Sequence, residues 1–216
     1  MLAKSRSDKV QALTAQEILM LDRSHISALI LAGGRGLRMG GMDKGLLGLE
    51  QQPLIEHVLQ RVQPQVGHIL ISANRNQSDY RRYGVPVLTD RLADYQGPLS
   101  GIAEGLRQVT TPWLLVVPCD SPQLPPDLAE RLAQAVSLTS PLAAIAHDGR
   151  YLQPAFNLVH QSLLPSLDFY LEGGGRKLGH WLQQQQPAIV DFSDQPQSFI
   201  NLNAPEQLQA FKFQTL

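Results

Sequence analysis

Short apolar segments alternate with amphipathic segments over most of this chain, and the alternation limits the folds it can adopt. Residues 26–32 form the first apolar segment. It is rich in Ile and Leu and stops at Gly33-Gly34, as a buried strand does before a turn. Residues 113–117 are so uniformly apolar that we expect a central strand covered on both faces. The pattern predicts an α/β fold with one mostly parallel central sheet and helices on both faces.

The other elements follow from the same periodicities. We expect further strands at residues 68–73, 85–88, 142–146, 155–159 and 188–192, and helices or helical turns at 53–63, 77–83, 98–109, 125–136, 163–171, 176–184 and 204–211. No linker rich in Gly, Ser or Pro divides residues 25–216, so we expect one domain there. Residues 1–24 are expected to form an N-terminal extension, either a short helix or disordered, since Thr14 and Glu17 have the spacing of a capping box.

Charge and cysteine content narrow the functional classes. The 216 residues carry a net charge of −1, so we expect neither a nucleic-acid partner nor attraction to a membrane surface. The apolar runs are too short to span a bilayer, and charged residues interrupt the first residues where a signal peptide would be apolar. Cys119 is the only cysteine. An internal disulfide is therefore impossible, and we expect a cytoplasmic protein.

The strongest motif is the glycine-rich segment 31–44, which follows the first strand directly and reads Leu-Ala-Gly-Gly-Arg-Gly-Leu-Arg-Met-Gly-Gly-Met-Asp-Lys. Glycines let a backbone turn sharply and bring its N–H groups close to an anion. Arg38 and Lys44 add positive charge suited to a polyphosphate. The segment is not a Walker A loop, because Gly45 follows Lys44, and Met39 stands where a dinucleotide fingerprint needs glycine. It therefore predicts another type of phosphate loop, with a glycine-rich surface turn as the alternative.

Two aspartates follow predicted strands at their carboxyl ends, where open α/β sheets bind ligands. Asp120 comes directly after the central strand and can hold Mg²⁺, which prefers one or two carboxylates together with substrate phosphates. Its alternative role is to cap a turn. Asp90 could hold a base edge or a ribose, or belong to an ordinary loop. Gly97 and Gly101 would let a ligand approach closely.

Two polar groups near the C-terminus are weaker signals. Asn201 and Asn203 precede the last predicted helix, and Asn203 taken alone is an ordinary helix N-cap. Arg176 and Lys177 follow three glycines and form either an anion site or a solvated loop.

Together these residues resemble the molybdenum cofactor guanylyltransferases. Residues 31–44 match the signature loop of that family, of the form LAGG…R-M-G…D-K. The loop alone would indicate only the broader superfamily of sugar-nucleotide and cofactor nucleotidyltransferases. The narrower resemblance spans residues 26–212 and rests on further motifs in the family's order and spacing: Asn74-Arg75, Asp90, residues 94–101, Pro118-Cys119-Asp120 and Asn201-Leu202-Asn203.

The resemblance implies a three-layer, Rossmann-like nucleotidyltransferase fold. It also implies transfer of GMP from GTP to molybdenum-molybdopterin, with Mg²⁺ as the metal and pyrophosphate as the leaving product. The implied nucleotide contacts are Leu31, Ala32, Gly33, Gly34, Lys44, Ser72, Asp90 and Asp120. The implied catalytic residues are Arg38, Lys44 and Asp120, with Asp120 as the metal ligand, and the implied acceptor contacts are Gly97, Pro98, Gly101, Asn201 and Asn203. Molybdenum cofactor biosynthesis proteins and molybdoenzyme chaperones are the protein partners that the resemblance suggests.

One position departs from the family pattern. Ser72 stands where some relatives carry Asn, and a hydroxyl lacks the paired donor and acceptor of an amide, which weakens the case for guanine. Three alternatives stay open: a cytidylyltransferase, a sugar-phosphate nucleotidylyltransferase, and a nucleotide-binding accessory protein without catalysis. For the transferase we expect in-line attack on the α-phosphorus, catalysed by positioning and electrostatics.

Overall fold

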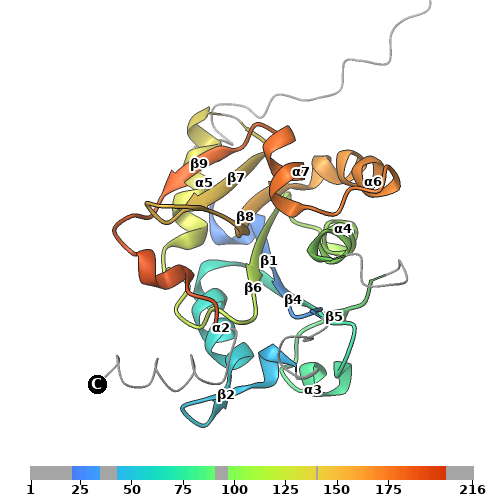
Figure 1. The fold of residues 1–216 in the computed structure, drawn as a ribbon, viewed down its shortest axis with the longest axis vertical. Coiled ribbons are helices and arrows are strands. Elements are labelled where there is room, and N and C mark those ends of the chain that lie inside the picture. Colours follow the sequence, from blue (N-terminus) through green and yellow to red (C-terminus); the bar gives the residue numbers. More distant parts are fainter. Residues whose placement is uncertain (1–20, 35–42, 91–96, 140, 203–216) are drawn as a thin grey trace, which may run out of the picture.

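The structure, a computed structural model, describes residues 21–34, 43–90, 97–139 and 141–202. A seven-stranded sheet with helices on both sides forms its centre (Figure 1). The strands of this sheet are β1 (Ile26–Leu31), β4 (His68–Ser72), β5 (Val87–Leu88), β6 (Trp113–Pro118), β7 (Ala143–His147), β8 (Leu152–His160) and β9 (Ala188–Asp191). The helices are α2 (Leu54–Val62), α3 (Gln77–Arg81), α4 (Pro98–Gln108), α5 (Leu128–Thr139), α6 (Leu164–Glu172) and α7 (Leu178–Gln184).

The order of the strands explains where a ligand site can form. They lie in the order β5-β4-β1-β6-β8-β7-β9. β5, β4, β1 and β6 are mutually parallel, whereas β8 is antiparallel to β6 and β7, and β9 is parallel to β7. The carboxyl ends of β5, β4, β1 and β6 therefore meet at one edge of the sheet. The predicted mostly parallel α/β sheet is confirmed.

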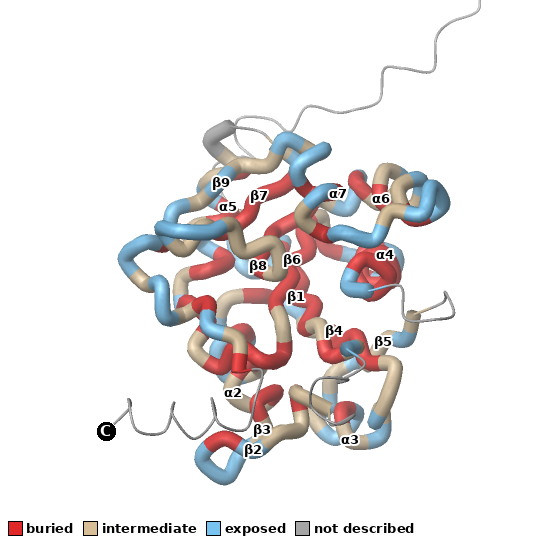
Figure 2. The backbone as a smooth tube through the Cα atoms, viewed as in Figure 1, coloured by how far each residue is buried: buried red, intermediate tan, exposed pale blue. Residues whose placement is uncertain are grey.

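Each face of the sheet has its own helix layer and its own core (Figures 1 and 2). On one face α2 and α5 pack through buried residues such as Val58 and Leu132. On the other face α4, α6 and α7 pack through residues such as Ile102, Leu167 and Trp181. Burying an aliphatic side chain of this size contributes about 1.5–3 kcal/mol. These two layers hold the strand ends in fixed positions.

Helix α2 shows how the sequence specifies these layers. Leu54, Ile55, Val58 and Val62 are buried and recur at the spacing that places them on one stripe of a helix. Helix α5 begins at Leu128, later than the predicted residue 125. Pro126 disfavours a helical conformation for Pro125 before it, and residues 126–127 form a turn ahead of the helix.

A short hairpin between the glycine-rich segment and α2 was not predicted. Strands β2 (Gly48–Leu49) and β3 (Gln52–Pro53) pair antiparallel. The two residues between them, Glu50 and Gln51, have φ values of 50° and 70°. Such left-handed turns usually carry Gly, Asn or Asp, so Glu50 and Gln51 are not a recognisable hairpin signal.

Single turns of 3₁₀ helix complete the described secondary structure: η1 (Arg23–His25), η3 (Lys44–Leu46), η4 (Gln63–Gln65), η5 (Gln161–Leu163) and η6 (Pro196–Phe199). The helix expected at 204–211 and most of the extension expected at 1–24 lie outside the described residues. The domain boundary at residue 25 stays a prediction. Within the described ranges, no helix is both long enough and apolar enough to cross a membrane.

Candidate active site

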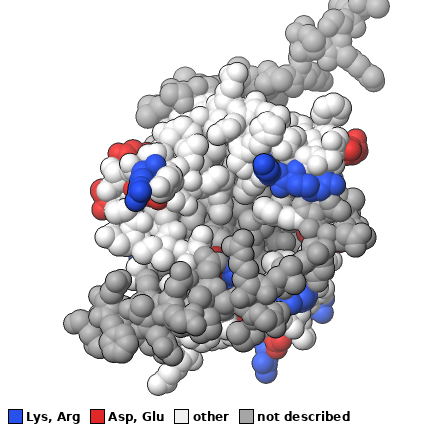
Figure 3. Space-filling model, viewed as in Figure 1, with Lys and Arg blue, Asp and Glu red and all other residues white. Residues whose placement is uncertain are grey.

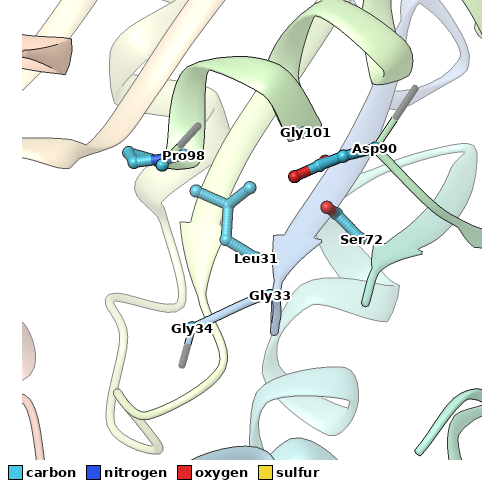
Figure 4. A pocket seen from close by; sticks show the side chains of 8 residues that line it. Leu31, Gly33, Gly34, Ser72, Asp90, Pro98 and Gly101 are labelled. Carbon is cyan, nitrogen blue, oxygen red and sulfur yellow. The ribbon is translucent and has the colours of Figure 1, made fainter. Parts of the chain in front are cut away.

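A cavity of about 340 Å³ opens where the parallel strands end. Its lining combines the ends of β1 and β4, the residues after β5 and the start of α4: Leu31, Gly33, Gly34, Ser72, Asp90, Gly97, Pro98 and Gly101. Figure 4 shows the side chains of Leu31, Ser72 and Asp90 pointing toward the same space beside the start of α4. All eight residues were predicted as nucleotide or acceptor contacts. Because they share one cavity, the division between the two kinds of contact stays a prediction.

Two glycines shape this cavity for different reasons. Gly97 precedes α4 with a φ of 81°, a left-handed conformation that glycine adopts at little cost. Gly101 faces Ser72 closely, and a Cβ at Gly101 would lie 2.5 Å from the Ser72 hydroxyl oxygen. Helix α4 can therefore approach the end of β4 only because residue 101 has no side chain.

Asp90 is fixed by Asn74, which follows β4 as Asp90 follows β5. The Asn74 Nδ2 donates to Asp90 Oδ2 over 2.8 Å, and the Asp90 backbone N–H donates to Asn74 Oδ1 over 2.9 Å. Asp90 Oδ1 is buried and has no hydrogen-bond partner among the described residues. Burial raises the pKa of the Asp90 carboxyl, hydrogen bonds from Asn74 and Ser100 oppose that rise, and the nearby Glu104 adds to it. The carboxylate is therefore held in place where it lines the cavity.

Lys44 and Asp120 form a contact beside these strand ends. The Lys44 ammonium donates to Asp120 Oδ2 over 3.1 Å, and both side chains are largely buried. Asp120 follows β6, and its carbonyl accepts the Leu202 N–H over 2.8 Å. Next to it, the Ser121 hydroxyl donates to Asn201 Oδ1 over 2.6 Å. The predicted acceptor residue Asn201 therefore lies close to the predicted metal ligand.

The other predicted residues have different positions. The Ala32 side chain packs in the core, and its N–H donates to the Ser72 carbonyl over 2.8 Å, so a nucleotide contact from Ala32 stays a prediction. Arg38 and Asn203 lie outside the described residues, as do residues 94–96. Asn74 was named among the motifs of the resemblance but was given no role in the site. Its position just after a buried parallel strand is the signal that could have indicated one.

The charged groups around the site occur singly or in small sets. On the face shown in Figure 3, Lys, Arg, Asp and Glu atoms form separate patches of both signs. Among the described residues, no three His, Cys, Asp or Glu side chains converge to form a metal-binding group.

A second cavity of about 400 Å³ lies against α2 and the β2–β3 hairpin. It is lined by Leu49, Glu50, His57, Gln60, Arg61, Pro122 and Gln123. The ring of His57 is already engaged, since its Nε2 lies 3.0 Å from the Leu49 carbonyl oxygen. The predicted site residues do not line this cavity.

Comparison with known proteins agrees with this geometry. The model of the MobA-like NTP transferase domain matches residues 28–188. A protein of Vibrio parahaemolyticus is 49% identical over 192 residues, which cover 89% of this chain and 97% of that protein. A protein of an Acidovorax species is 48% identical over 206 residues, covering 89% and 98% respectively. Both are molybdenum cofactor guanylyltransferases.

Solved structures agree in fold. The molybdopterin-guanine dinucleotide biosynthesis protein A of Archaeoglobus fulgidus gives a TM-score of 0.73 at 22% identity, covering 88% of this chain and all of that one. The 4-diphosphocytidyl-2C-methyl-D-erythritol synthase of Anaerococcus prevotii gives 0.66 at 15% identity, covering 90% of this chain and all of that one. The chain belongs to the MobA-like NTP transferase family, as its resemblance to the molybdenum cofactor guanylyltransferases predicted, and it is a nucleotidyltransferase.

Proposed function

We propose that this protein transfers GMP from GTP to molybdenum-molybdopterin and releases pyrophosphate. The observation that carries the proposal is the Lys44–Asp120 contact of 3.1 Å beside a cavity at the carboxyl ends of parallel strands. This is the position at which open α/β sheets bind nucleotides. The names of the relatives, which are about 48% identical over most of the chain, specify the base and the acceptor.

In this proposal Asp90 selects the base. Guanine presents two N–H donors on one edge, and the Asp90 carboxylate, which lines the cavity and is held in place by Asn74, is an acceptor. Ser72 lies beside it and is buried, so its hydroxyl is a second polar contact in the cavity. A buried acceptor left unpaired costs about 1–3 kcal/mol. A base without a donor at this place would therefore bind more weakly.

Asp120 has the chemistry that a Mg²⁺ site requires. It supplies a hard carboxylate after the end of β6, where the Lys44 ammonium donates to its Oδ2. Mg²⁺ commonly uses one or two carboxylates, with phosphates and waters as the other ligands, so one carboxylate fits. The ion would neutralise negative charge on the phosphates.

The chain's own groups account for the rest of the reaction. Lys44 binds oxygens of the triphosphate, and the backbone N–H groups of Gly33 and Gly34 are positioned at the strand end where phosphates approach. The terminal phosphate of the acceptor attacks the α-phosphorus in line. A new P–O bond forms as the bond to the β-phosphate oxygen breaks, and pyrophosphate leaves. Lys44 stabilises the charge that develops on pyrophosphate. The acceptor is already an anion, so no general base is required.

A transfer assay tests the proposal. The protein, MgCl₂ and molybdenum-loaded molybdopterin are incubated separately with GTP, CTP and ATP, and pyrophosphate and dinucleotide product are quantified. We expect product with GTP alone. Product with CTP would overturn the base assignment and direct attention to Ser72. GTP binding without product would overturn the acceptor, and sugar 1-phosphates would then be screened.

The cytoplasmic location and protein partners among cofactor biosynthesis proteins and molybdoenzyme chaperones belong to the same proposal. They rest on the single cysteine and on the family of the relatives. Co-purification from cytoplasmic extract, with the transfer assay as the readout of an intact enzyme, tests both.

A further inference from the structure

Three donors converge on the carboxylate of Asp43, the residue directly before Lys44. The Gly45 N–H donates to Asp43 Oδ1 over 3.2 Å, and the Tyr80 hydroxyl donates to the same oxygen over 2.5 Å. The amide of Asn76 donates to Asp43 Oδ2 over 3.1 Å. Tyr80 and Asn76 belong to the region of α3, about 35 residues further along the chain, so these bonds attach the Lys44 turn to a distant helix.

Asn76 makes this bond instead of an ordinary capping bond. It occupies the N-cap of α3, where an Asn side chain usually accepts from the helix backbone, yet no side-chain capping bond forms. Its backbone is left-handed, with a φ of 48°, a conformation that few residues other than Gly and Asn adopt. The local geometry of α3 is therefore arranged to direct this amide at Asp43.

Tyr80 also fills the space beneath the Lys44 turn. Its side chain is fully buried, and a Cβ at Gly45 would lie 2.5 Å from the Tyr80 hydroxyl oxygen and 3.3 Å from Cys119 Sγ. Burial raises the pKa of the Tyr80 hydroxyl, and Cys119 and Asp43 add to that rise. The phenol stays protonated, so it remains a donor.

We propose that Tyr80 is a positioning residue that acts through Asp43 to hold Lys44 for phosphate binding. Lys44 is the first residue of η3, and Asp43 is the N-cap of that turn. A phenol that fixes the cap therefore fixes where the Lys44 side chain begins. The inference rests on the proposed function, because it requires Lys44 to bind the triphosphate of GTP.

A double-mutant cycle on GTP binding tests this role without an acceptor. Calorimetric titration with GTP and MgCl₂ gives Kd for wild type, Tyr80→Phe, Lys44→Ala and the double variant. We expect Lys44→Ala to weaken binding about tenfold and Tyr80→Phe about fivefold, as for the loss of a charge-assisted contact. In the Lys44→Ala background, Tyr80→Phe should add less than about twofold, because residues that act as one unit are not additive.

Tyr83→Phe is the matched control. Tyr83 follows α3 two residues after its end, and its hydroxyl interacts with Glu56 instead of Asp43. Its removal should leave Kd unchanged. Should Tyr80→Phe fail to fold, Asn76→Gly carries the test, because Asn76 is exposed and glycine accepts the left-handed backbone. We expect Asn76→Gly to cause the same loss of GTP affinity as Tyr80→Phe, and to cause no such loss in the Lys44→Ala background.

The outcomes distinguish the positioning role of Tyr80 from the proposed phosphate site at Lys44. Equal losses from Tyr80→Phe with and without Lys44, or no loss at all, would overturn the positioning role while leaving Lys44 as a phosphate ligand. A Lys44→Ala protein that binds GTP as wild type does would overturn the proposed phosphate site and the positioning role with it. A shift in melting temperature alone, with unchanged Kd, would make Tyr80 a structural residue only.

Discussion

The two halves of the sheet have different polar chemistry, although both are well packed. In the half made of β5, β4, β1 and β6, all strands are parallel, and polar residues follow their carboxyl ends, among them Asn74, Asp90 and Asp120. In the half made of β8, β7 and β9, β8 runs opposite to the other strands, so its carboxyl end lies at the opposite edge of the sheet. Strands that run in one direction end at one edge, and the residues that follow them can therefore meet in one site.

The largest expected effect comes from removing the Asp120 carboxylate. Asp120→Ala should lower turnover about 10³-fold, as when a main source of electrostatic stabilisation is removed, with the fold retained. Pyrophosphate release measures it. Asp191→Ala is the matched control, because Asp191 ends β9 in the other half, is exposed, and bonds mainly to Ser193. Comparable losses from both variants would remove the distinction between the halves.

Protonation of Asp90 should change GTP binding. Burial raises the pKa of its carboxyl, so GTP affinity should fall as the pH drops through that raised value and the acceptor oxygen is protonated. Asp90→Asn should weaken GTP binding about 10- to 30-fold at neutral pH, the scale of a hydrogen bond to a charged group, and should remove the pH dependence. Calorimetric titrations at pH values from about 4 to 8 measure this pH dependence. A GTP affinity that stays constant over the range would show that Asp90 does not contact the base.

The raised pKa of Asp90 also affects the stability of the fold, and the pH dependence of stability is opposite to that of GTP affinity. A carboxyl whose folded-state pKa is raised stabilises the fold below its unfolded pKa, and this contribution is lost as the pH rises through the folded value. At neutral pH the ionised Asp90 therefore costs stability, and Asp90→Asn should raise the urea midpoint. Weaker GTP binding together with a more stable protein is the expected pair of results.

The half without the site should respond in stability alone. Phe156 on β8 is fully buried, and its ring lies 4.9 Å from that of Phe199, edge to face. Phe156→Leu should lower the free energy of unfolding by about 1.5 kcal/mol and leave Kd for GTP unchanged. Urea denaturation measures the loss, and Phe169→Leu is the control, because Phe169 is 79% exposed. A changed Kd would show that packing in this half of the sheet affects GTP binding in the other half.

The smallest expected effect concerns Arg131 of α5. Its guanidinium pairs with Asp194 at 3.0 Å and stacks 3.9 Å from the centre of the Phe192 ring. Solvent-exposed pairs of this kind contribute little to stability. Arg131→Met should therefore lower the urea midpoint only slightly, and less in high salt, since the ionic part is screened. A loss that does not change with salt would assign the contribution to packing on Phe192.

Many of the strands and the cavity at their ends could be predicted from the sequence. The other features depend on pairing between residues that are far apart along the chain. Uniform apolar runs such as residues 113–117 predicted central strands, and residues after strands predicted the cavity. The direction of β8 was not predicted, although Asp148-Gly149 is a hairpin signal. Asn74 meets Asp90 only because β4 pairs with β5 in the register Ser72 with Leu88, and Tyr80 meets Asp43 only after α3 has packed. Neither pairing has a local sequence pattern.

The hydrogen bond between the Leu202 N–H and the Asp120 carbonyl determines when, during synthesis on the ribosome, the backbone at Asp120 becomes fixed. Ser72 and the strands that Gly33, Asp90 and Asp120 follow are all made long before residue 202. The second edge of β6 stays uncovered until residues 152–160 are made, and an uncovered strand edge can pair wrongly. A nascent chain can therefore assemble the cavity early, but the backbone that presents Asp120 is secured only after residue 202 has been made.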